Sequence, residues 1–104
     1  MAELTPTNPE LRISAGPDGL LSLAGELDVA STPQLRAAMQ QQIDAGVQRC
    51  VLDLKDLSFC DSSGLTALLW AEQTFPDGIL LHRPDRQLRK ILQATQLDQA
   101  LAIE

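Results

Sequence analysis

The residues of this sequence that could carry chemistry gather in one stretch, which contains Asp61, Ser62, Ser63 and Gly64. A short apolar run precedes the stretch, and leucines at helical spacing follow it. This order predicts a strand, a loop and a helix, with both serines at or beside the N-terminus of the helix. In open α/β sheets, reactive and ligand sites favour this position at the carboxyl end of a strand.

A phosphate group is the modification that such a position can accept. The N-terminus of a helix has unpaired N–H groups and partial positive charge, so it tolerates nearly two negative charges on a serine. The added charge would change the local surface without unfolding the domain. Asp61 would strengthen the resulting repulsion of a docked partner. The alternative is simple helix capping without chemistry, because serine and aspartate are common caps.

Other polar and aromatic residues leave two interpretations open. Asp28 follows a predicted strand, where an ordinary loop aspartate is the plain interpretation. Asp53 alternates with leucines, so it is either a polar strand position or a hydrogen-bond partner of the loop that presents Ser62. Trp70 and Phe75 belong either to the core or to an apolar patch, and an exposed Trp70 would favour a partner interface.

The sequence argues against an enzyme. His82 is the single histidine, and residues 60–64 lack the Gly-x-Ser-x-Gly turn of serine hydrolases. No cluster has the spacing of metal ligands, and no Gly-x-x-x-x-Gly-Lys loop could hold nucleotide phosphates. We therefore expect no catalytic residue, no metal and no cofactor.

Composition restricts the class of partner and the compartment. The 104 residues suit one small domain, and the net charge of −6 argues against nucleic acid or an anionic membrane as the main partner. We find no run of ~18 apolar residues for membrane insertion and no signal-peptide pattern. Cys50 begins a predicted strand and Cys60 lies just past its end, which is too far apart for a disulfide; two free thiols indicate a reducing compartment. We expect a cytoplasmic protein that is a monomer or a weak dimer.

The predicted elements alternate between strands and helices. Pro-containing residues 1–10 are expected to be a flexible lead-in, and residues 11–104 the domain. Gly25 is expected to mark a bulge or a close backbone approach. We expect residues 55–61 to form a loop and Asp85 to cap a helix. Strands are predicted at 11–15, 20–27, 49–54 and 79–82, with another at 101–103, and helices after Thr32, Ser62 and Asp85. This pattern predicts an α/β fold with a mixed, mostly parallel sheet of four to five strands, an N-terminal hairpin and three or more helices.

Several motifs together resemble one protein family. They are Gly25-Glu26-Leu27-Asp28, Leu52-Asp53-Leu54 and the run from Leu57 to Leu65, with a matching tail after Leu88. In this order and spacing they are similar to the STAS domain, found in sulphate transporters and anti-sigma factor antagonists. The resemblance covers about 11–103 and rests most on Asp61-Ser62-Ser63-Gly64-Leu65.

The resemblance implies a function by partner switching. Bacterial members of this length are commonly anti-sigma factor antagonists, which bind an anti-sigma factor serine kinase and thereby release a sigma factor for transcription. The kinase phosphorylates the first serine of the motif, here Ser62, and a serine phosphatase restores the active form. The binding surface in such proteins corresponds to Asp28, Asp61, Ser62, Ser63 and Gly64.

Two alternatives come from the same family. One is a STAS subunit of a membrane transport complex of the lipid-transport ABC type, and the other is a scaffold of a signalling complex. The sequence departs from the family in a shorter helix after Ser62 and in the large Trp70. Either departure could alter the partner.

Overall fold

The computed structural model describes residues 10–104, and its elements alternate as the sequence predicts. The predicted lead-in lies outside the described residues apart from Glu10. The elements are β1 (Arg12–Ala15), β2 (Leu20–Leu27), α1 (Thr32–Asp44), β3 (Cys50–Cys60), α2 (Ser62–Thr74), β4 (Ile79–His82), α3 (Arg86–Ala94), a 3₁₀ turn η1 (Leu97–Gln99) and β5 (Ala102–Ile103).

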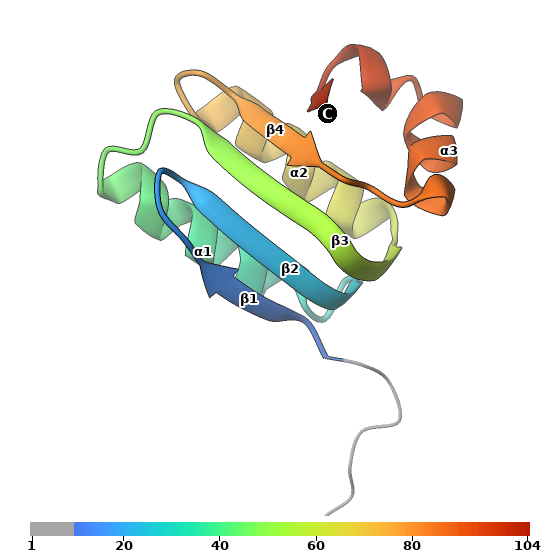
Figure 1. Ribbon diagram of the computed structural model, residues 1–104, viewed down its shortest axis with the longest axis horizontal. Coiled ribbons are helices and arrows are strands. Elements are labelled where there is room, and N and C mark those ends of the chain that lie inside the picture. The colour runs from blue at the N-terminus through green and yellow to red at the C-terminus, as the bar shows by residue number, and fades with distance from the viewer. Residues whose placement is uncertain (1–9) are drawn as a thin grey trace, which may run out of the picture.

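The strands form one five-stranded sheet in the order β1-β2-β3-β4-β5. β1 pairs antiparallel with β2, and every other neighbouring pair is parallel. From β2 to β5 the chain advances in one direction, so right-handed crossovers place the connecting helices on the same side. Figure 1 shows α1 and α2 together behind the sheet and α3 beyond the end of β3. The predicted α/β fold with an N-terminal hairpin is confirmed.

The core lies between the sheet and the helices and is almost entirely aliphatic. Alternate residues of β2 are buried, because successive side chains of a strand point to opposite faces. Phe75 also belongs to the core, with only 2% of its surface exposed. Trp70 is half-buried and lies under the Arg36 guanidinium, 4.9 Å from the ring centre, so it joins α2 to α1. The fully buried large side chains include Leu23, Leu27, Leu35, Met39, Leu52, Leu54, Leu68, Ile79, Leu81 and Leu92.

The prediction of a loop at residues 55–61 was wrong, because β3 continues to Cys60. Two register shifts against β2 explain the error. Between the pairs Ser22↔Asp53 and Ala24↔Asp56, β3 advances by one residue more than β2, and it does so again between Gly25↔Leu57 and Glu26↔Phe59. Each extra residue is a β-bulge that interrupts the alternation of buried and exposed side chains. The sequence therefore loses its strand pattern while the strand continues.

Gly25 fulfils both expectations for it. It lies at the second register shift and has a φ of +103°. A Cβ at this position would lie 2.2 Å from the Glu10 carbonyl oxygen, so the backbone approaches too closely for any side chain.

Both cysteines lie in β3, and both are free and buried. Burial raises the pKa of each thiol to about 12 because the thiolate would lose its hydration. In the part of the chain that the structure describes, no helix is long and apolar enough to cross a membrane.

Candidate functional site

The site lies at the carboxyl-end edge of the sheet, where β2 and β3 finish side by side. Leu27, the last residue of β2, is in register with Cys60, the last residue of β3. The Asp61 N–H donates to the Leu27 carbonyl oxygen at 3.1 Å. This bond brings the loop after β2, which begins at Asp28, next to the start of α2.

Asp61 caps α2, and neither Ser62 nor Ser63 does so. Asp61 has extended backbone angles, and its Oδ1 accepts a hydrogen bond from the Gly64 N–H at 3.1 Å. A carboxylate in this position satisfies one of the four free N–H groups of the helix and interacts favourably with the helix dipole. Ser62 and Ser63 are consequently the first two residues of the helix itself.

Ser62 presents its hydroxyl to solvent. The residue is exposed, and no hydrogen bond to its hydroxyl is found among residues 10–104. Its carbonyl oxygen accepts a bond from the Thr66 hydroxyl at 3.0 Å, one turn further along. Ser63 is half-buried. The two neighbouring serines therefore differ in access, and Ser62 is the one that another protein can reach.

Gly64 allows the helix to approach the sheet closely. It is buried, and a Cβ there would lie 2.7 Å from Cys60 Sγ and 2.9 Å from Leu27 Cδ2. These distances are shorter than any that real Cβ contacts adopt. Gly64 thus holds the start of α2 against the ends of β2 and β3, which fixes where Ser62 lies.

Asp28 shapes its own loop. Its Oδ1 accepts from the backbone N–H groups of Ala30 and Ser31, each at 3.0 Å, and from the Ser31 hydroxyl at 3.1 Å. The Ser31 hydroxyl is also 2.9 Å from the Asp28 backbone N–H. These bonds make an Asx turn that leads into α1. Asp28 is therefore a structural residue of this loop, at the same edge as Ser62.

Two exposed apolar residues at this edge were missed by the sequence analysis. Val29 is 72% exposed and Phe59 is 47% exposed, and among residues 10–104 no other large hydrophobic residue is exposed. No signal in the sequence singles out Val29. The exposure of Phe59 could have been predicted only by recognising the second bulge, because of which Phe59 points outward while Leu57 and Cys60 are buried.

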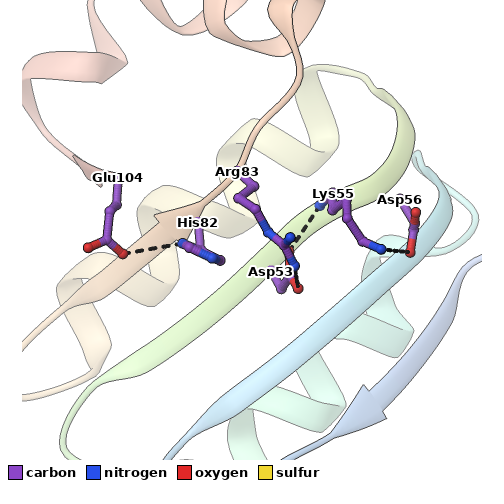
Figure 2. Close-up of polar contacts among 6 residues, drawn as sticks. All are labelled: Asp53, Lys55, Asp56, His82, Arg83 and Glu104. Atoms are coloured by element: carbon purple, nitrogen blue, oxygen red, sulfur yellow. Dashed lines mark hydrogen bonds and ion pairs between the residues drawn. The ribbon is translucent and has the colours of Figure 1, made fainter.

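Asp53 and His82 lie on the side of the sheet away from α1 and α2 (Figure 2). Figure 2 shows Asp53 beside Arg83, whose guanidinium lies 2.7 Å from Asp53 Oδ2. The hydrogen bond from Arg83 is the main reason that the pKa of Asp53 is lowered, and a bond from the Lys55 backbone N–H adds to it. Of the segment 55–61 that we expected Asp53 to contact, Asp53 accepts a hydrogen bond from the Lys55 backbone N–H, at the end of the segment far from Ser62, and its side chain also forms an ion pair with Arg83 in the turn before α3.

His82 Nδ1 lies 3.2 Å from Glu104 Oε1. Figure 2 draws this contact on the same side of the sheet as the Asp53–Arg83 pair. Within residues 10–104, no group of three or more His, Cys, Asp or Glu residues could hold a metal ion.

The edge is acidic and contains no cation on the segments that form it. Residues 26–35 carry Glu26 and Asp28, and residues 57–66 carry Asp61, with no Lys, Arg or His in either segment. The two aspartates accept backbone hydrogen bonds at helix starts. A phosphate on Ser62 would add further negative charge to this edge.

The fold and this edge define a small α/β module of the STAS class. A family model described as "Mlab, STAS domain" matches residues 13–103. The match spans most of the chain, so the protein belongs to the STAS domain family.

Solved structures share the same fold. An anti-sigma factor antagonist from Mycobacterium paratuberculosis is 21% identical and has a TM-score of 0.78, with 95% of this chain and 87% of that chain covered. The Bacillus cell fate determinant SpoIIAA in its phosphorylated form is 24% identical and has a TM-score of 0.66, with 90% of each chain covered. SpoIIAA has also been solved in its unphosphorylated form as an anti-sigma factor antagonist, with 24% identity and a TM-score of 0.68 over 90% of this chain and 86% of that one.

Proposed function

We propose that this protein is an anti-sigma factor antagonist that acts by partner switching. In its unmodified form it binds an anti-sigma factor serine kinase, which frees a sigma factor and so regulates transcription. The kinase phosphorylates Ser62, and a serine phosphatase reverses the modification. The protein itself catalyses no reaction, and it acts in the cytoplasm.

The observation that carries the proposal is the free, exposed hydroxyl of Ser62 beside the cap supplied by Asp61. Because Asp61 already satisfies the Gly64 N–H, modification of Ser62 removes no hydrogen bond from α2. The partial positive charge of the helix start further tolerates the added dianion. The folded domain can therefore keep its stability in both states.

The same phosphate is unfavourable once a partner covers the edge. It lies next to Asp61, and the nearby loop carries Asp28. A doubly charged group beside carboxylates in a closed contact suffers repulsion and loses its hydration. The family resemblance implies a partner-binding surface at Asp28, Asp61, Ser62, Ser63 and Gly64, to which the buried Gly64 contributes by positioning the start of α2. Phosphorylation of Ser62 opposes this binding.

A direct test is phosphorylation by the cognate anti-sigma factor kinase. The protein is incubated with the purified kinase and ATP, and the modified residue is identified by mass spectrometry. We expect one phosphate on Ser62 in the parent chain, the same result in Ser63→Ala, and none in Ser62→Ala. Phosphorylation that persists in Ser62→Ala would contradict the assignment of the site.

A second candidate function comes from another class of protein. The matching family model is described by the name Mlab and not as an anti-sigma factor antagonist. The alternative is therefore a STAS subunit of a membrane transport complex of the lipid-transport ABC type, in which Ser62 need never be modified. In that case the kinase would leave the protein unmodified, and the protein would co-purify with a transport ATPase.

A further inference from the structure

Val29 and Phe59 are exposed apolar side chains at one edge of the molecule. Single exposed hydrophobic residues are common on protein surfaces and need no explanation. These two, however, share the carboxyl-end edge, because Glu26 is in register with Phe59 and Leu27 with Cys60. Val29 follows Leu27 by two residues, and Ser62 follows Phe59 by three.

The exposure of Phe59 results from the second bulge in β3. Leu57 is in register with Gly25 and is buried, so regular alternation would also bury residue 59. The extra residue between the two register pairs instead turns Phe59 outward and brings Cys60 to the buried side. Bulges are found next to functional sites, where they redirect a side chain.

A small apolar pocket opens beside Phe59. It has a volume of about 40 Å³ and lies between the end of β3 and the first turns of α3. Leu57, Leu88 and Ile91 contribute its apolar wall. The space suits the end of one aliphatic side chain from another protein.

We propose that Val29 and Phe59 are the two apolar anchors with which this edge holds its protein partner, and that the partner inserts an aliphatic side chain into the pocket beside Phe59. The inference rests on the proposed function and names the chemistry of its partner surface. Residues 26–35 and 57–66 carry Glu26, Asp28 and Asp61 and no cation, so the part of the partner that faces them is apolar with Lys or Arg at its periphery. The segment 83–90, on the other side of the pocket, carries four cations and faces a different part of the partner.

This arrangement also explains how one phosphate has a large effect. Aromatic and aliphatic anchors near the centre of an interface supply most of its binding energy by excluding water. A phosphate on Ser62, three residues from Phe59, brings water and two negative charges into that contact. The partner is then lost although neither anchor has changed.

The test measures binding of the full chain to the purified cognate anti-sigma factor kinase. Val29→Ser and Phe59→Ser are each expected to weaken binding by about fivefold or more, the effect typical of an interface anchor. Both side chains are exposed, so we expect the variants to fold as the parent does. Val47→Ser is the control away from this edge, because Val47 precedes the amino end of β3; since this half-buried valine packs against the core, thermal unfolding first verifies that the variant is folded. It should bind like the parent.

Hydrogen exchange of the unmodified complex gives an independent measurement. We expect the kinase to slow amide exchange in residues 27–31 and 57–62. Suppose that the parent chain binds the kinase but Val29→Ser and Phe59→Ser bind it as tightly as the parent does, or that these segments gain no protection. The anchor assignment is then overturned, and the proposed function stands. If the parent chain does not bind the kinase at all, the proposed function is overturned and the anchors with it.

Discussion

Asp61 and Ser62 are neighbours, and in the function that we propose they divide two tasks between them, capping of the helix and acceptance of the phosphate. Asp61 accepts the Gly64 N–H and begins the helix, while Ser62 contributes no side-chain hydrogen bond and remains exposed. If one residue had to cap the helix and also accept the phosphate, each modification would disturb the helix start. The separation of the two tasks lets the surface change while the helix stays in place.

The cap predicts a difference between two substitutions of Asp61. Asp61→Ala removes the acceptor for the Gly64 N–H, so we expect it to lower the free energy of unfolding by about 1 kcal/mol. Asp61→Asn keeps an acceptor oxygen and should retain most of that stability. Urea denaturation of both variants measures the difference. Equal losses would mean that the charge of Asp61, and not its hydrogen bond, stabilises the helix.

At Gly64 we expect the usual preference of helices for alanine over glycine to be reversed. Alanine is better than glycine in a helix interior by about 1 kcal/mol, yet we expect Gly64→Ala to destabilise the protein, because its Cβ would overlap Cys60 Sγ and Leu27 Cδ2. Thermal unfolding should show a lower midpoint.

A double variant separates this overlap from other causes. Introducing Cys60→Ala removes one of the overlapping groups, so Gly64→Ala should cost less in that background than in the parent. An equal cost in both backgrounds would show that the contact with Cys60 is not responsible.

At the scale of elements, β3 contacts both the start of α2 and the turn that leads to α3. Its final residues position Ser62, while Asp53 in its first half pairs with Arg83 in the turn that leads to α3. Arg83 has a φ of +60°, which is unusual for a residue with a side chain, so the ion pair helps to hold that turn. The same strand therefore places the start of α2 and the approach to α3.

The Asp53–Arg83 pair predicts a pH dependence. The pKa of Asp53 is lowered in the folded protein, so its contribution to stability is present above its unfolded pKa of about 3.9 and is lost as the pH falls through the lower folded value. Asp53→Asn should therefore flatten the acid side of the stability profile. The free energy of unfolding of parent and variant, measured between neutral and acidic pH, tests this. Parallel profiles would show that Asp53 does not contribute.

The elements differ in how well the sequence predicts them. β2, β4 and the cap of α3 by Asp85 follow from local signals, because alternation and helix-start residues act over a few positions. The second half of β3 could not be predicted, since its bulges depend on pairing with β2. For the same reason the sequence located Ser62 near the helix start but could not show that Asp61 is the cap or that Phe59 is turned outward.

At the scale of the whole molecule, one side of the sheet packs against the core, and one edge carries the surface that we propose for recognition. The helix-covered side holds the aliphatic core, and the carboxyl-end edge gathers Ser62, Val29 and the acidic residues. Because the buried residues of β2 and β3 end next to this edge, a rigid core supports the surface that we propose a partner binds. Changes of charge at the edge need not propagate into the core.

Cys50 and Cys60 report on the integrity of that core. Both are buried, and their pKa values of about 12 leave almost no thiolate at neutral pH, so they should not react with a thiol reagent while the protein is folded. In denaturant both should react rapidly. Thiol titration with and without denaturant checks this. Rapid labelling of either cysteine in the folded protein would show that the core opens more readily than the structure implies.

The most direct test of the account compares Ser62→Asp with the uncharged Ser62→Asn. Affinity for the cognate anti-sigma factor kinase and the unfolding midpoint are measured for both variants and for the parent chain. We predict that Ser62→Asp binds about tenfold or more weakly, a difference of about 1.4 kcal/mol, and Ser62→Asn much less so. The free energy of unfolding of both variants should lie within about 0.5 kcal/mol of that of the parent, because Ser62 is exposed. If Ser62→Asp bound the kinase as tightly as the parent while remaining folded, the switch at Ser62 would be contradicted.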